Sequence, residues 1–146
     1  MQSNVMKILL ENDLCVLCTC SNDVPDASLM LYICDDRCTK MHMLTLRETT
    51  KYVNIASNPN VSLLIDTRDT IDEKKGQIKA LTIHGEASIV DDNDASGELI
   101  DRMIKKHDKL SNLASSESVC VIEVSVKSIL FLENVDKGYN VSLPEN

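Results

Sequence analysis

The chain has 146 residues, of which 43% are hydrophobic, and this suits one compact domain with a single core. A formal net charge of −8 argues against a nucleic-acid partner, because binding to phosphates relies on clustered Lys and Arg. No apolar run is long enough for a membrane span and no signal peptide is visible, so we expect a cytoplasmic protein. Six cysteines in a chain that is not a small secreted scaffold fit the same reducing compartment.

The first half of the chain is predicted to start with a helix and continue as a β-meander. Ser3 is expected to cap a helix over residues 3–12, where apolar residues recur at helical spacing. Alternating and β-branched runs then predict three strands, separated by turn-rich segments. The strands are expected at residues 14–20, 27–34 and 41–46, and the turns at residues 21–26 and 35–40.

The next part of the chain is predicted to contain a short helix and two strands. The helix covers residues 49–57, and Asn58-Pro59-Asn60 ends it because proline cannot continue the hydrogen-bond ladder. Strands are expected at residues 61–65 and 77–90, the longer one bent at Gly85 as in a barrel.

The C-terminal part is predicted to contain one helix and two more strands. Four residues rich in Asp, 91–94, supply N-cap candidates for a helix that reaches about residue 109. Strands are expected at residues 118–126 and 128–134. The tail, residues 135–146, lacks periodicity and should be loose unless another subunit holds it down.

This order of elements predicts a mostly β fold. Six or seven strands with few helices favour a small antiparallel barrel, because a sheet with few covering helices protects its edges by closing. We expect one domain over residues 1–146, with the barrel at about 14–134.

The segment that offers the most groups for binding a ligand leads from a predicted strand into a predicted helix. It reads Leu44-Thr45-Leu46-Arg47-Glu48-Thr49-Thr50-Lys51 and offers two cations and three hydroxyl groups. Free N–H groups and the dipole at a helix start bind phosphate well, and Arg47 and Lys51 can add charge-assisted bonds. The alternative is an ordinary threonine cap flanked by solvated cations.

Several landmarks from residue 14 to about residue 132 resemble the FMN-binding split-barrel family related to pyridoxamine-phosphate oxidase. The resemblance rests on the order and spacing of the landmarks together. They are a first strand (Cys15 to Cys20), Pro25, a second strand from Ala27-Ser28, a third ending Leu44-Thr45, Thr49-Thr50-Lys51, Asn58-Pro59-Asn60-Val61-Ser62-Leu63 and Thr82-Ile83-His84-Gly85-Glu86-Ala87.

The resemblance implies a split β-barrel that holds FMN at the interface of a homodimer. By analogy, one group of residues would line the flavin ring and ribityl chain, another would hold the phosphate, and Arg47 is added on charge grounds. The ring and ribityl group is Ser28, Leu29, Met30 and Leu31, with Thr45 beside it; the phosphate group is Thr49, Thr50 and Lys51. Gln77 and Lys79 are candidates for reaching the flavin of the neighbouring subunit.

The sequence also departs from the family pattern. Members that are oxidases often have arginine where Ser28 and Thr50 stand. Residues 133–146 contain neither arginine nor histidine, whereas pyridoxamine-phosphate oxidases grip the substrate phosphate with such residues near the C-terminus. Oxidation of pyridoxamine phosphate is therefore not expected.

Three functions remain open at this point. The first is an FMN-dependent oxidoreductase acting on a small molecule, and the second is an FMN-binding electron carrier without an organic substrate of its own. The third is a flavin-free module that binds haem or a deazaflavin and serves in a stress response. Haem would need an axial ligand such as His84 or His42.

The cysteines are interpreted as structural thiols rather than as a metal or redox motif. Cys15 and Cys18 should point to opposite faces of a strand, while Cys18 and Cys20 share a face. Cys34, Cys38 and Cys120 complete no spaced motif, so no metal site is expected.

Overall fold

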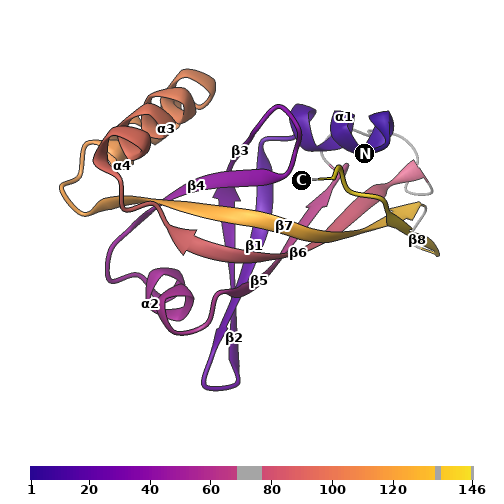
Figure 1. Ribbon diagram of the computed structural model, residues 1–146, viewed down its shortest axis with the longest axis horizontal. Coiled ribbons are helices and arrows are strands. Elements are labelled where there is room, and N and C mark those ends of the chain that lie inside the picture. Colours follow the sequence, from indigo (N-terminus) through magenta and orange to yellow (C-terminus); the bar gives the residue numbers. More distant parts are fainter. Residues whose placement is uncertain (69–76, 134–135, 146) are drawn as a thin grey trace.

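The computed structural model describes residues 1–68, 77–133 and 136–145 as a curled antiparallel sheet with helices at its margins (Figure 1). The strands are β1 Leu14–Ser21, β2 Val24–Leu31, β3 Ile33–Cys34, β4 Lys40–Leu46, β5 Asn60–Asp66, β6 Lys79–Ile89, β7 Val119–Glu133 and β8 Lys137–Val141. The helices are α1 Ser3–Glu11, α2 Thr50–Ser57, α3 Asn93–Lys106 and α4 Ser111–Ala114, with a 3-10 turn η2 at Asp108–Leu110.

The strand order makes this sheet a split barrel. It runs β2-β1-β5-β6-β7-β4-β3, with β8 paired to β7, and every pairing is antiparallel. The sheet curls until β1 faces β4, where the Cys15 thiol lies 3.9 Å from the sulfur of Met43. The curl confirms the predicted split β-barrel and leaves its seam between β2 and β4.

Side chains of alternate residues fill the interior of the barrel. On β1 the inward residues Cys15, Leu17 and Thr19 are each at most 2% exposed. A second cluster, made of Ile33, Leu44, Met103 and Val121, lies where α3 covers the other face of β3, β4 and β7. The core therefore sits inside the curl, with a satellite under α3.

The long strands bend at Gly85, as the sequence predicted. The β6–β7 register shifts between His84 and Gly85, so that Lys127 is an extra residue on β7. A Cβ at Gly85 would lie 2.6 Å from the Ser125 carbonyl oxygen, so only glycine fits here. The bulge also explains why the two predicted strands at 118–126 and 128–134 are wrong: the ladder passes Lys127 and continues as one strand.

The predicted loose tail is also wrong for one part of its length, residues 137–141. Residues 137–141 form β8, which pairs with β7, and Val141 is 7% exposed in the barrel core. Residues 134, 135 and 146 lie outside the described residues. Five residues without an obvious pattern become a strand because β7 offers an unpaired edge beyond β4.

The first hairpin is tighter than predicted. Asn22 and Asp23, with φ of 50° and 63°, form its turn, so β2 begins at Val24 rather than at residue 27. Pro25 is tolerated inside β2 because this strand is at the sheet edge. The predicted strand 27–34 is divided at Tyr32, whose hydroxyl donates to the Leu9 carbonyl at 2.6 Å.

The helix predictions are confirmed apart from their ends. Ser3 is the first residue of α1 and does not cap it. Thr49 caps α2 and Asp92 caps α3. Helix α3 ends at Lys106 rather than near residue 109, because the His107 ring turns inward and its Nε2 lies 2.8 Å from the Tyr32 carbonyl oxygen.

Candidate functional site

The turn from β4 into α2 is built on a pair of threonine hydroxyls. Thr45, next to the last residue of β4, is 3% exposed, and its Oγ1 lies 3.0 Å from that of Thr49. The Thr49 hydroxyl donates to the Leu46 carbonyl at 2.9 Å and accepts the Tyr52 N–H at 3.4 Å. Because the only hydrogen of Thr49 goes to Leu46, Thr45 must be the donor to Thr49. This network fixes the direction in which α2 starts.

Arg47 and Glu48 form the exposed part of the same turn. Glu48 has φ of 76°, a left-handed conformation that a residue with a Cβ rarely adopts. The Arg47 guanidinium donates to the Tyr52 hydroxyl at 3.2 Å and lies 5.8 Å from the ring centroid. These contacts hold a cation beside the first turn of α2.

The start of α2 favours an anion. Within the part of the chain that the structure describes, the N–H groups of Thr50 and Lys51 have no protein acceptor, as expected for a first turn. That turn contains no acidic residue, so the dipole there is not offset within the helix. Five predicted residues, Thr45, Arg47, Thr49, Thr50 and Lys51, are thus brought together around one helix start.

The four predicted residues of β2 divide between two faces of the sheet. Ser28 and Met30 point into the barrel beside the inward residues of β1, and Met30 is 8% exposed. Leu29 and Leu31 point outward, and Leu29 is 69% exposed. Side chains on successive strand residues diverge, so a ligand on one face meets two of these side chains and not all four.

Gln77 and Lys79 lie far from the helix start within one chain. Lys79 pairs with Glu133 at the end of β7, whereas Leu46 pairs with Val119 at its beginning. Those two positions on β7 are separated by roughly 45 Å of extended strand. Gln77 and Lys79 could therefore approach a ligand held at α2 only from another subunit.

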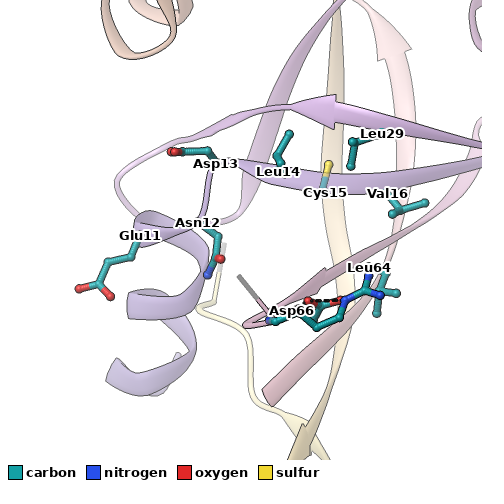
Figure 2. A pocket seen from close by; sticks show the side chains of 10 residues that line it. Glu11, Asn12, Asp13, Leu14, Cys15, Val16, Leu29, Leu64 and Asp66 are labelled. Carbon is teal, nitrogen blue, oxygen red and sulfur yellow. Dashed lines mark hydrogen bonds and ion pairs between the residues drawn. The ribbon is translucent and has the colours of Figure 1, made fainter. Parts of the chain in front are cut away.

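A hollow that the sequence analysis did not predict lies on the outer face of the sheet, beside the end of α1 (Figure 2). Its volume is about 400 Å³. Its walls are the apolar side chains of Leu14, Val16, Leu29 and Leu64, with Cys15 between, and its margin holds Glu11, Asn12, Asp13, Asp66 and Arg68. Arg68 forms a 3.0 Å ion pair with Asp66.

The same outer face presents exposed apolar side chains in the hollow and beyond it. Four leucines on β1, β2, β5 and β7 form what we call the outer patch. They are Leu14 (39% exposed), Leu29 (69%), Leu64 (37%) and Leu130 (38%). Large exposed apolar side chains that gather on one face mark an interaction surface.

The histidines and the β1 cysteines provide no metal centre. Among the described residues, no three His, Cys, Asp or Glu side chains lie together as metal ligands. His42 is 4% exposed with its Nε2 3.0 Å from a Glu123 oxygen, while His84 is exposed on the outer face. Burial, with a smaller contribution from Cys18, raises the pKa of the Cys15 thiol to about 12, so this thiol stays protonated.

Cys120 sits directly behind the threonine pair. Its thiol donates to the Thr45 carbonyl at 3.6 Å. Burial raises the pKa of Cys120, and the nearby Arg47 acts in the opposite direction. A neutral thiol here closes the back of the turn without adding negative charge.

This geometry defines the class of protein as a split barrel with an anion-favouring helix start beside its seam. Residues 1–133 match the family model described as pyridoxamine 5'-phosphate oxidase. The chain therefore belongs to the pyridoxamine 5'-phosphate oxidase family. No curated protein matches it.

Solved structures with the same fold carry different ligands in their names. The haem storage protein HutZ from Vibrio cholerae is 16% identical over 86% of this chain and 89% of its own, with a TM-score of 0.73. An FAD-binding protein from Mesorhizobium loti is 14% identical over 90% and 94%, with a TM-score of 0.71. General Stress Protein 26 from Bacillus anthracis is 19% identical over 94% and 95%, with a TM-score of 0.66. At these identities the likeness concerns the fold alone.

No helix within residues 1–68, 77–133 and 136–145 is both long and apolar enough to cross a membrane.

Proposed function

We propose that this protein binds FMN and acts as an FMN-dependent oxidoreductase on a small molecule. The observation that carries the proposal is the start of α2, where the unpaired N–H groups of Thr50 and Lys51 lie beside the Arg47 guanidinium and no acidic residue occupies the first turn. A terminal phosphate suits such a donor set, because the helix dipole and charge-assisted hydrogen bonds act on the same group. Membership of the family supports the same cofactor.

Each residue of the turn has a role in this proposal. Lys51 and Arg47 supply charge to the phosphate, and the N–H groups of Thr50 and Lys51 point at its oxygens. Thr45 and Thr49 fix the turn through their mutual hydrogen bond at 3.0 Å. Ser28 and Met30, whose side chains point into the barrel, are the residues of β2 that we assign to the ribityl chain and ring.

FMN, when bound, supplies hydride or electron transfer, so the chain needs no acid or base of its own. The protein would position the cofactor and exclude water from it. Pyridoxamine phosphate is not the proposed substrate, because residues 133–146 contain no arginine or histidine to hold its phosphate.

We further propose a homodimer in the cytoplasm, with the outer patch as the contact between copies. The four leucines of the patch lie on one face, and burying them against a second copy removes their exposed apolar surface from water. In such a dimer Leu29, Leu31, Gln77 and Lys79 serve the cofactor of the partner rather than their own. Six free cysteines suit a reducing compartment.

The first test is a flavin titration followed by absorbance and fluorescence. We expect wild-type protein to bind FMN, and the Arg47→Ala, Lys51→Ala double variant to bind it at least about tenfold more weakly, since a hydrogen bond to a charged group contributes about 1.5–3 kcal/mol. Riboflavin, which lacks the phosphate, should bind both proteins alike. Lys127→Ala, Lys137→Ala is the matched control for net charge.

Failure of the wild type to bind FMN would contradict the proposal. A Soret band that appears on adding haem and disappears in His84→Ala would instead favour a haem-binding module. If FMN binds but reduced nicotinamides and small-molecule acceptors give no turnover, the electron carrier becomes the better description.

The dimer is tested separately by sedimentation of the Leu29→Glu variant. A charge in a buried apolar patch should weaken self-association by about thirtyfold or more, which is typical of an interface hot spot. Val53→Glu is the control, because Val53 is 54% exposed on α2 and lies outside the patch. A wild-type monomer at micromolar concentration would contradict the proposed contact.

A further inference from the structure

A second pocket, away from the β4–α2 turn and from the outer patch, has a cysteine in its wall. It has a volume of about 410 Å³ and lies where the end of α1, the short strand β3 and the last turns of α3 meet. It is lined by Leu10, Ile33, Cys34, Arg102, Lys105 and Lys106. The lining thus combines two apolar residues and a cysteine with three cationic residues.

Behind Cys34 lies a second thiol, that of Cys38. Cys34 is 9% exposed and Cys38 is fully buried. Cys38 closes the turn that follows Cys34, with its N–H donating to the Asp35 carbonyl at 3.0 Å, and both side chains belong to the same buried cluster. Cys38 holds φ of 56°, a conformation that costs free energy in a residue with a Cβ. The chain therefore keeps a cysteine in a strained position directly beside another cysteine.

The two thiols behave as a pair that shares a proton. A hydrogen bond from Cys34 lowers the pKa of Cys38, and burial opposes this effect. The same contact, together with burial, raises the pKa of Cys34, against the effect of Lys106. One proton therefore leaves the pair more readily than from an isolated buried thiol, and the other stays between the two sulfurs.

The cations around the pocket give it a chemical preference. Arg102, Lys105 and Lys106 lie within five residues of α3, in a chain whose net charge is −8. Lys106 is held in place, with its Nζ 3.4 Å from the Leu10 carbonyl oxygen and 5.9 Å from the centroid of the Tyr32 ring. A concentration of positive charge at a pocket mouth attracts anions and accelerates their arrival.

We propose that Cys34 and Cys38 are a redox-active dithiol, and that the pocket takes a low-molecular-weight disulfide bearing carboxylates. The pair first loses one proton to solvent. With the remaining proton on Cys38, the Cys34 thiolate attacks one sulfur of that disulfide, and a Cys34 mixed disulfide forms while one small thiolate leaves. Cys38 then attacks the Cys34 sulfur and releases the second small thiol. Overall, two protein thiols are oxidised to one disulfide and one small disulfide is reduced to two thiols.

The site is independent of the flavin proposal. It lies beside the turn that begins β4, while the proposed cofactor lies at the end of that strand. No electron from a flavin enters the exchange, so the dithiol can be tested on protein that contains no FMN.

The test uses the whole protein and glutathione disulfide, with tryptic mass spectrometry as the readout. Arg37 lies between the two cysteines, so trypsin separates them into two peptides that remain joined only by a disulfide. We expect the joined peptides as the main product in the wild type. The Cys38→Ser variant should instead accumulate the glutathione adduct on Cys34, and Cys20→Ser should behave as the wild type.

The role of the cations is tested by the charge of the reagent. Wild-type protein should react faster with glutathione disulfide, an anion, than with neutral 2-hydroxyethyl disulfide, and more slowly with cationic cystamine. The Arg102→Gln, Lys105→Gln variant should lose this preference, with a several-fold slower reaction toward glutathione disulfide alone. Both residues are on the surface, so the variant is expected to fold.

Two results would overturn the proposal. One is modification of the half-buried Cys18 or Cys20 while Cys34 and Cys38 remain reduced. The other is a rate that does not depend on reagent charge in the wild type.

Discussion

The two ends of strand β4 carry turns of similar backbone geometry and opposite chemistry. Each contains one residue other than glycine in a left-handed conformation, Cys38 at φ 56° before the strand and Glu48 at φ 76° after it. Each is tied by local hydrogen bonds, to the Asp35 carboxylate in one case and through Thr49 in the other. The first turn directs a thiol into the core, and the second presents cations and hydroxyls beside a helix start.

The difference follows from what lies next to each turn. Before β4, the chain folds back beside α1, so Cys38 is fully buried in the same cluster as Cys34. After β4, the chain enters α2 at the surface, where Arg47 and Thr50 are exposed. In both turns the neighbouring elements hold a residue in a strained backbone conformation. Whether those elements bury or expose the turn decides which chemistry its side chains can perform.

The largest effect is expected at the buried end of β4, from Asp35→Ala. The Asp35 carboxylate accepts from the Thr39 N–H at 2.7 Å, the Thr39 hydroxyl at 2.8 Å and the Lys40 N–H at 2.9 Å. Loss of three charge-assisted bonds should lower the free energy of unfolding by about 2–4 kcal/mol in urea titrations. Asp36→Ala, an exposed neighbour, should change it by less than about 0.5 kcal/mol.

The same variant has a defined pH dependence. Burial alone would raise the pKa of Asp35, but hydrogen bonds from Lys40 and Thr39, with a contribution from His42, lower it overall. A depressed pKa stabilises the folded state above the unfolded value of about 3.9, and this stabilisation is lost as the pH falls through the lower folded value. The difference in the free energy of unfolding between the wild type and Asp35→Ala should therefore become smaller below about pH 4. A constant gap would contradict this assignment.

A smaller effect is expected at the exposed end, from Thr49→Ala. Removing the cap of α2 should lower the free energy of unfolding by about 1 kcal/mol and leave the Thr45 hydroxyl without its partner. Under the flavin proposal, FMN affinity should fall with it, as measured by fluorescence titration. Thr50→Ala, at an exposed position without the capping bond, should keep the stability. An equal decrease in the free energy of unfolding in both variants would show that the capping hydrogen bond of Thr49 does not order this turn.

The smallest effect is expected from Glu48→Gln. This substitution removes a negative charge beside the proposed phosphate, and because Glu48 is exposed, FMN affinity should improve by only about threefold at low salt. Glu48→Gly removes the charge and also relieves the left-handed strain. Comparing its FMN affinity with that of Glu48→Gln therefore separates the effect of the backbone conformation from that of the charge. Weaker FMN binding in Glu48→Gln would mean that the carboxylate contacts the ligand through a hydrogen bond.

The elements that depend on local pattern were predictable from sequence. The helices at residues 3–12 and 49–57, the long strand with its bend at Gly85 and the phosphate-favouring run from Thr45 to Lys51 follow from periodicity, capping and glycine placement. Family resemblance added the barrel and the cofactor expectation. The division of Ser28 to Leu31 between two faces was also implicit in strand alternation, although the four were predicted as one group.

Other features depend on pairing between distant segments. One strand over Val119–Glu133 replaces two because the bulge opposite Gly85 absorbs Lys127, and Lys137–Val141 becomes a strand only because β7 has a free edge. No local signal reports either event. The pocket at Cys34 was equally hidden, since its lining comes from α1, β3 and α3.

The sequence by itself determined the mostly β class, the family, the hairpin order and the group of residues around the start of α2, because these rest on short-range spacing. The tertiary structure alone decided which side chains of each strand face the barrel interior, which leucines form an exposed patch, and that Cys34 lines a pocket together with three cations. The physical reason is that faces, patches and pockets are made by segments that the curl of the sheet brings together, and the free energy that selects this curl comes from burial of the whole core rather than from any one segment.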